Sequence, residues 1–269
     1  MNLKYEITLN VDNDWKMNRH HFHDEFEILL SLSDAGHVFI EDKVYPLRKG
    51  TLLLIKDTIL HKTIVDSLNT YERYVIHFSS DTLERISSKK TSLYSIFSNI
   101  NMCIQLDDRE YKEILAIMKQ FHLKETPSFG NDILNDTYFI QMIVKIAQLL
   151  MSQDSKQEYN TADISKIEPI IAFLKENLHI KLSLDAIANN FFISKYHLCH
   201  QFKQYTGFTI NEFIINSRII QAKKYLREGL PVQEAGELSG FNNNSHFIRT
   251  FSKLTGVSPG KYSREYKIT

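Results

Sequence analysis

The chain has 269 residues, enough for one or two domains that each bury a core. Its composition is that of a soluble globular protein, with 43% hydrophobic and 24% charged residues. The N-terminus lacks the apolar segment of a signal peptide, and no apolar run approaches the ~20 residues of a membrane span. Two cysteines, Cys103 and Cys199, form neither a disulfide framework nor a metal-binding pair. These features predict a cytoplasmic protein with reduced thiols and no membrane partner.

The net charge is zero, but the two halves of the chain differ in sign. Residues 161–269 contain 14 Lys/Arg and 9 Asp/Glu, which gives +5, and residues 1–160 therefore carry −5. A basic C-terminal part is typical of a protein that binds the phosphate backbone of a nucleic acid.

Residues from about 24 to 80 are predicted to form β-structure. Short runs of aliphatic and aromatic residues at 25–32, 37–40, 51–55 and 71–78 are separated by turn-forming residues. Several short strands at regular spacing predict a barrel or a sandwich.

Helical spacing replaces this pattern after residue 80, with helices predicted over 107–123 and 132–151. Both helices can pack on the β-structure, or the second can also pair with its counterpart in another subunit. The width of its apolar face leaves both interpretations open. The polar segment 152–163 is predicted to link an N-terminal domain, 1–151, to a helical domain, 164–269.

An internal repeat marks the helical domain. The segment 202–213 returns 49 residues later at 251–262, and at this offset Leu198 aligns with Phe247 and Phe192 with Phe241. The repeat predicts two helix-turn-helix units, at about 183–205 and 231–254. A helix over about 209–227 joins them, and its length of about 28 Å approaches the ~34 Å between successive major grooves.

The second helix of each unit has one face for the core and one for a partner. In the first unit the residues at helical spacing on the inward face are Leu198, Phe202 and Tyr205, and those on the outward face are Tyr196, Cys199, His200 and Lys203. In the second unit the inward residues are Phe247, Phe251 and Leu254, and the outward residues are Ser245, Arg249 and Ser252. Ser194 and Asn243 are the expected N-caps. A DNA recognition helix needs this division between an anchored and a free face.

The stretch 182–266 resembles the DNA-binding domain of the AraC/XylS family of bacterial transcription regulators. The residues that carry the resemblance are Leu184, Ala188, Ser194, Leu198, Phe202, Lys203, Thr206, Gly207, Phe213, Arg218, Ala222, Leu226, Gly240, Phe241, Phe247, Phe251, Thr255, Gly256, Pro259 and Tyr262.

The resemblance implies double-stranded promoter DNA as a partner, and RNA polymerase as well if the protein activates transcription. It implies base contacts from Tyr196, Cys199 and His200 in the first unit and from Asn244, Ser245 and Arg249 in the second. Phosphate contacts are implied for Lys195, Lys203 and Lys253. Among these, Arg249 is the strongest candidate for a direct contact to guanine.

One departure from the family pattern lies in the first helix of the second unit, where the chain has Ala235-Gly236. An interior glycine costs up to about 1 kcal/mol of helix propensity. The second unit is therefore predicted to be the looser one.

The N-terminal half contains His21-Phe-His23, then Glu27, Gly50 and His61, which resembles the two motifs of the cupin barrel. In metal-binding cupins the matching residues are ligands, which here would be His21, His23, Glu27 and His61, a set suited to Mn, Fe, Ni or Zn. Regulators of the AraC type commonly keep this pattern without a metal. We therefore expect no resident cofactor and a polar pocket lined by His21, His23, Glu27, His37, Tyr45, His61 and His77.

Two hypotheses follow. The favoured one is a non-enzymatic, ligand-responsive regulator: a cupin-like β-barrel with appended helices binds a small molecule, with a sugar as the first candidate. An all-α domain of two helix-turn-helix units then binds DNA, and a homodimer forms through 132–151. The alternative is a metal-binding cupin enzyme with an attached DNA-binding domain.

Overall fold

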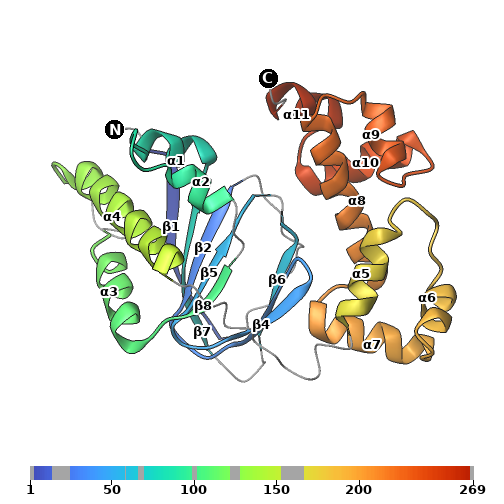
Figure 1. Cartoon of the computed structure of the whole chain (residues 1–269), viewed down its shortest axis with the longest axis horizontal. Helices are drawn as coiled ribbons and strands as arrows, with labels where there is room; N and C mark the ends of the chain where they lie inside the picture. Colours follow the sequence, from blue (N-terminus) through green and yellow to red (C-terminus); the bar gives the residue numbers. More distant parts are fainter. Residues whose placement is uncertain are drawn as a thin grey trace. The chain divides into compact units, whose positions relative to one another are not determined.

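A computed structural model describes residues 3–13, 25–57, 59–65, 70–98, 102–121, 128–152 and 167–266. The chain divides into two compact units. The first comprises Met1–Val38, Tyr45–Ile59 and Thr63–Tyr159, and the second comprises Phe39–Val44, Leu60–Lys62 and Asn160–Thr269. The predicted division into a sheet-rich N-terminal half and a helical C-terminal half is confirmed (Figure 1). The predicted linker lies outside the described residues.

The strands form two antiparallel sheets. Their bounds are Tyr5–Asp12 for β1, Phe26–Ser31 for β2, Gly36–Ile40 for β3, Lys43–Leu47 for β4, Thr51–Ile55 for β5, His61–Val65 for β6, Tyr71–Phe78 for β7 and Met102–Gln105 for β8. The strand order is β1-β7-β2-β5-β8 in one sheet and β4-β3-β6 in the other. No individual strand was predicted at β1, β4, β6 or β8. β4 and β6 lie inside the predicted β-region of about 24–80, whereas β1 and β8 lie outside it. The apolar residues of β1 alternate with polar ones, which is a strand signal that the prediction missed, and β8 has only four residues.

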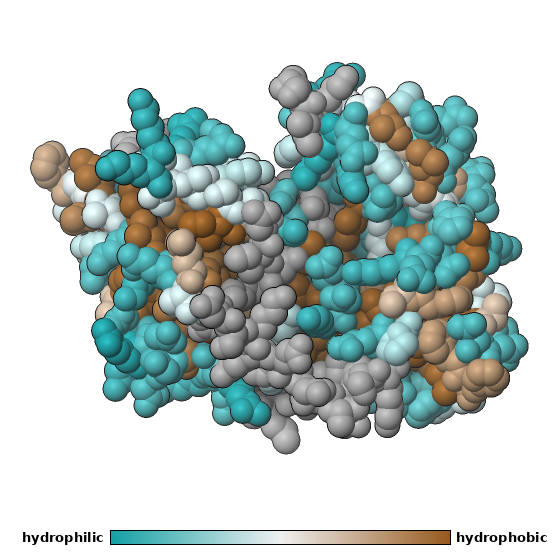
Figure 2. Space-filling view, in the orientation of Figure 1, coloured by the Kyte–Doolittle hydropathy of each residue, from teal (hydrophilic) through white to brown (hydrophobic). Residues whose placement is uncertain are grey.

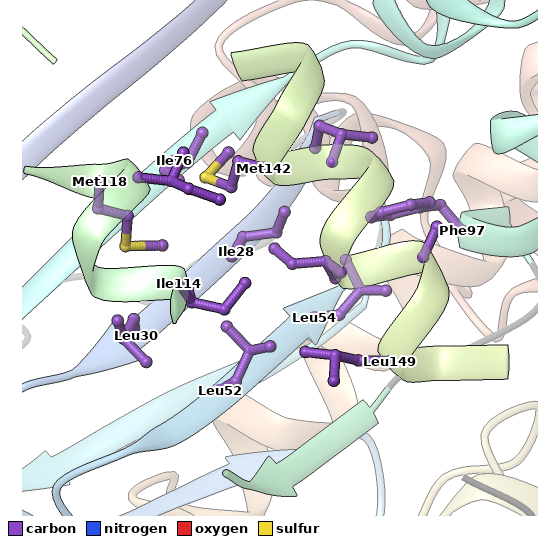
Figure 3. Packing of buried hydrophobic residues seen from close by; sticks show 14 of the residues in the cluster. Ile28, Leu30, Leu52, Leu54, Ile76, Phe97, Ile114, Met118, Met142 and Leu149 are labelled. Carbon is purple, nitrogen blue, oxygen red and sulfur yellow. The ribbon is translucent and has the colours of Figure 1, made fainter. Parts of the chain in front are cut away.

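In the part of the first unit that the structure describes, four helices pack on one face of the five-stranded sheet. Their bounds are Ser80–Ile86 for α1, Leu93–Ser98 for α2, Asp108–Met118 for α3 and Asn131–Ser152 for α4. Alternate residues of the strands face them, as in Ile28 and Leu30 of β2 and Leu52 and Leu54 of β5 (Figure 3). Each of these side chains is at most 2% exposed, and their burial against the helices is the main stabilising contribution to this unit.

The opposite face of the same sheet is polar at one end. The backbone register places Glu27 of β2 beside His77 of β7, and His77 beside Glu6 of β1. His77 Nε2 lies 3.2 Å from Glu27 Oε2. Burial disfavours the imidazolium of His77, but the hydrogen bond to Glu27 and the charges of Glu27, Glu25 and Glu6 outweigh burial and raise its pKa above the usual value.

The second unit contains the helices of the C-terminal half. Their bounds are Glu168–Glu176 for α5, Leu184–Asn190 for α6, Lys195–Thr206 for α7, Ile210–Arg227 for α8, Val232–Leu238 for α9, Asn244–Thr255 for α10 and Pro259–Tyr266 for α11. The pairs α6–α7 and α9–α10 are the two helix-turn-helix units, and α8 connects them (Figure 1). Thr209 and Glu212 form a capping box that fixes the start of α8.

The turns of the two units differ by one residue. Phe192 and Gly240 both have positive φ, 54° and 91°, and each follows the last turn of its helix. In both units the amide of the following residue donates to the carbonyl five residues earlier. These bonds run from Ile193 N to Ala188 O and from Phe241 N to Gly236 O. The alignment of Phe192 with Phe241 was therefore wrong: Phe192 corresponds to Gly240, and the second turn has one extra residue before its N-cap.

Gly236 is a packing requirement in α9. A Cβ atom at this position would lie 2.6 Å from Cδ1 and 2.9 Å from Cγ of Phe247, a ring that is fully buried. The glycine lets the recognition helix α10 approach α9 closely, and this contact offsets the loss of helix propensity. The structure gives no reason to consider the second unit loose at this point.

We predict that Gly236→Ala destabilises the helical domain by about 1–3 kcal/mol, because the added methyl overpacks the Phe247 ring. Helix propensity alone predicts the opposite sign, a gain of up to about 1 kcal/mol. Urea unfolding of the full chain, followed by circular dichroism at 222 nm, measures the change. Gly260→Ala in α11 is the control, because nothing lies within 4 Å of its added Cβ and it should be neutral or stabilising. Stabilisation by both substitutions would contradict the packing argument.

The raised pKa of His77 predicts a pH-dependent stability. A group whose pKa is higher in the folded state stabilises fully below its unfolded pKa, about 6.5, and this contribution disappears as pH rises through the folded value. The stability advantage of the wild type over His77→Gln should therefore be larger at about pH 6 than at about pH 8.5. Urea unfolding of the full chain at each pH value, followed by circular dichroism at 222 nm, measures the difference. An equal difference at both pH values would show that the ion pair does not contribute.

Candidate DNA-binding surface

The first recognition helix, α7, is fixed at both ends and anchored from one side. Ser194 Oγ accepts a hydrogen bond from His197 N, and the left-handed Gly207 closes the C-terminus. Leu198 and Phe202 are fully buried, and the Phe202 ring lies 5.5 Å from that of Phe213 on α8 in an edge-to-face arrangement. The helix therefore has little freedom to rotate about its axis.

The outward face of α7 has the predicted residues. Tyr196 is 80% exposed, and its ring stacks on that of His200 with centroids 6.0 Å apart. His200 and Lys203 are exposed, and Cys199 is half-buried. Lys195 Nζ lies 3.0 Å from Asp185 Oδ2. Because both partners are exposed, this ion pair is weak enough to open for a phosphate.

Phe192 lies in the turn before α7, and it corresponds to Gly240 of the second unit and not to Phe241 as the repeat alignment predicted. Its side chain is 96% exposed, and φ is 54°, a conformation that a bulky residue rarely adopts. Apolar side chains gather on the surface over α6 and α7 in Figure 2. The adjacent Phe191 and Phe192, the second of them two residues before the N-cap Ser194, are the sequence signal for an aromatic side chain in this turn.

The second recognition helix, α10, repeats the arrangement. Asn243 Oδ1 accepts from His246 N, which confirms its predicted role as N-cap. Phe247 and Phe251 are fully buried, whereas Ile248 at the edge is 37% exposed. The predicted DNA-contacting residues of this helix, Asn244, Ser245, Arg249 and Lys253, are all exposed. Arg249 Nε donates to Ser245 O at 3.3 Å, which leaves the outer guanidinium nitrogens available for a ligand.

Each recognition helix thus presents donors and a positive helix N-terminus on a face that the fold does not use. The N-terminal turn of a helix attracts phosphate, and an exposed guanidinium can bind guanine O6 and N7 in a bidentate manner. The connecting helix α8 has 18 residues, which corresponds to about 27 Å. The surface therefore has the chemistry and the dimensions for reading duplex DNA.

The predicted pocket residues of the N-terminal half are only partly within the described residues. His21 and His23 lie outside them. Glu27 and His77 are brought together as described above, His37 on β3 and Tyr45 on β4 are half-buried, and His61 at the start of β6 is buried. Among the described residues, no group of three or more His, Cys, Asp or Glu side chains could hold a metal ion.

In the part of the chain that the structure describes, no helix is both long enough and apolar enough to cross a bilayer.

Comparisons with known proteins cover both halves. Residues 6–143 match the family model of an AraC-like ligand binding domain, and residues 187–265 match that of a helix-turn-helix domain. The chain is 28% identical over 255 residues to the uncharacterized HTH-type transcriptional regulator YfiF of Bacillus subtilis, covering 92% of this chain and 79% of that protein. It is 24% identical over 249 residues to the HTH-type transcriptional activator RhaS of Escherichia coli, covering 89% and 85%.

Among solved structures, ToxT from Vibrio cholerae O395 covers 98% of this chain and 99% of its own, with 15% identity and a TM-score of 0.40. The two family models together span most of the chain, and they match the halves in which the structure has its sheets and its paired helix-turn-helix units. The chain belongs to the AraC family of transcription regulators, with an AraC-like ligand-binding domain followed by a helix-turn-helix domain.

Proposed function

We propose that the protein binds promoter DNA in the cytoplasm through α7 and α10, and that a small molecule bound to the N-terminal domain changes this binding. The protein is not an enzyme in this account and needs no resident cofactor. The observation that supports the proposal most directly is the division of both recognition helices into a buried aromatic face and an exposed polar face. RNA polymerase is a further partner if the protein activates transcription.

Base recognition is divided unequally between the helices in this proposal. The outward face of α10 offers an amide, a hydroxyl and a guanidinium, from Asn244, Ser245 and Arg249. The outward face of α7 offers mainly the rings of Tyr196 and His200. We therefore assign hydrogen-bond reading chiefly to α10 and apolar contact, for example with thymine methyl groups, chiefly to α7. Lys195, Lys203 and Lys253 are the proposed phosphate contacts.

The ligand proposal rests on the polar face of the five-stranded sheet. Glu27 is buried and hydrogen-bonded to His77, and both side chains lie on the face opposite to the hydrophobic core. A carboxylate and an imidazole in this position can hold hydroxyl groups of a polar ligand in a fixed orientation. A small polar molecule such as a sugar is the proposed class of effector, and it would act by favouring one of two pre-existing states of the protein.

A homodimer is the proposed assembly, formed by α4. One side of this helix, away from the core, has the three- and four-residue spacing of a coiled-coil seam at Ile133, Thr137, Ile140, Val144, Gln148 and Met151. Ile133 and Met151 are 67% and 72% exposed, and apolar side chains reach the surface along α4 in Figure 2. The seam has no charged residue, so it can face an identical seam in an isologous contact.

The experiment that tests the function is selection of DNA from a random pool by the purified protein, with and without candidate metabolites, followed by sequencing. A recovered consensus that changes in yield with one metabolite supports the proposal. Recovery of random DNA only, under every condition, would refute it.

On the selected DNA, Arg249→Ala should weaken binding by about 1–3 kcal/mol, because a bidentate base contact is lost. Binding to random DNA should change much less, as measured by fluorescence anisotropy at fixed salt. Arg264→Ala is the control, since Arg264 is an exposed arginine on α11 outside the recognition helices. Equal losses on selected and random DNA would instead assign Arg249 to a phosphate.

Val144→Glu should weaken the dimer, since it places a charge at the centre of the seam. We expect the dissociation constant to rise at least about tenfold, a cost of at least about 1.4 kcal/mol, in sedimentation equilibrium. Asp132→Asn, a single charge change on the same helix outside the seam, is the control and should leave the constant unchanged. A dimer that survives Val144→Glu with the same affinity would place the interface elsewhere.

A further inference from the structure

Arg218, in the middle of α8, joins three elements of the helical domain. Its side chain is half-buried, Nε donates to Leu178 O and Nη2 donates to Ile180 O, both at 2.8 Å. The two carbonyls lie one and three residues beyond the C-cap of α5, Asn177. Each carbonyl oxygen is a hydrogen-bond acceptor and suits a guanidinium N–H.

The turn of the second helix-turn-helix unit closes on the same point. Gly240 has a φ of 91°, and a Cβ atom there would collide with Leu178 O and would lie 2.8 Å from Arg218 Nε. The Phe241 ring centroid is 6.0 Å from the Arg218 guanidinium carbon. Segment 178–180, the connecting helix and the second turn are therefore packed together with no room for an additional side chain at Gly240.

The chemistry of this joint favours a geometric role for Arg218. Burial lowers the pKa of the guanidinium, and the hydrogen bonds that hold it go to neutral backbone carbonyls. A planar guanidinium can donate to two carbonyls in one fixed orientation, whereas a lysine ammonium is a point charge on a flexible stem. Arg218 therefore fixes the orientation of segment 178–180 relative to α8 as well as the distance between them.

Segment 178–180 leads within a few residues to Ser183, the N-cap of α6. Whatever fixes this segment against Gly240 and Phe241 also fixes the first helix-turn-helix unit against the second. α8 alone sets the distance between α7 and α10, but a single helix leaves their relative rotation dependent on side-chain packing. The joint at Arg218 supplies that missing constraint.

We propose that Arg218 is a positioning residue that fixes the angle between α7 and α10, so that the protein selects DNA with one spacing between the two half-sites. This inference rests on the proposed function, because it requires both helices to bind the same DNA.

The test uses the full chain and the selected DNA, with the half-site spacing changed by one and two base pairs in either direction. The wild type should lose about 100-fold in affinity away from the preferred spacing, because the two helices can no longer bind together. At the preferred spacing, Arg218→Gln and Arg218→Lys should bind the DNA more weakly than the wild type does. When the spacing is changed, the affinity of each variant should fall by less than about tenfold relative to its own value at the preferred spacing. Lys224→Gln, an exposed cation on the same helix, should keep the wild-type profile.

The flatter spacing profile is the discriminating result, since simple destabilisation of the fold would lower affinity equally at every spacing. An unchanged profile in both Arg218 variants would overturn the inference and leave the proposed function intact. Failure of the wild type to select any DNA would overturn both.

A measurement without DNA tests the same inference independently. Spin labels at Gln204→Cys on α7 and Lys253→Cys on α10, with Cys103 and Cys199 changed to Ser, report the distance between the two helices by pulsed electron paramagnetic resonance. Labelled chains are diluted with excess unlabelled protein, so that distances within one chain dominate over those between subunits. We expect one narrow distance distribution in the parent and a broader one after Arg218→Gln. Equal widths in a variant that remains folded by circular dichroism would contradict the role.

Discussion

The DNA-binding surface depends on the anchoring of each recognition helix by buried aromatic rings. Phe202 of α7 packs against Phe213 of α8, and Phe251 of α10 packs against Tyr262 of α11 with centroids 5.5 Å apart. Each ring buries a large apolar area and fixes the rotation of its helix. Because the inward face is fixed, the outward residues have a defined direction, and a short, rigid presentation of this kind is what base-edge recognition requires.

Close backbone approach is the second constraint, and it acts through glycines. Gly236 lets α9 approach Phe247, and Gly240 lets the second turn approach the segment after α5. Both residues belong to the second unit, whereas the first unit has Ala188 and Phe192 at the corresponding places. The two units of the repeat thus share hydrogen-bonding and capping but differ in packing, which is consistent with different roles in reading DNA.

Much of the helical domain could be predicted from the sequence. Its helices are specified by local signals, and local signals predict helices well. These signals are the spacing of Leu198 and Phe202, the N-caps Ser194 and Asn243, and the Thr-Gly pair at the end of each recognition helix. The one-residue difference between the turns could not be predicted in this way. It depends on which residue takes a positive φ, and Phe192 is an improbable choice for that conformation.

The N-terminal domain was less predictable, because its strands are stabilised by neighbours far apart in the chain. β8 pairs with β5 and is an edge strand of the five-stranded sheet, yet its four residues contain no periodic pattern. The partnership of Glu27 and His77 likewise depends on the register of β2 against β7. The role of Arg218 was missed for a similar reason, since it is defined by backbone carbonyls 38 and 40 residues away.

Hydroxyl-radical footprinting of the full chain on its selected DNA tests the central claim most directly. If α7 and α10 occupy successive major grooves, the protected backbone should form two patches on one face of the duplex, about 10–10.5 base pairs apart. A single patch, or two patches on opposite faces, would contradict the claim that both helices read one site.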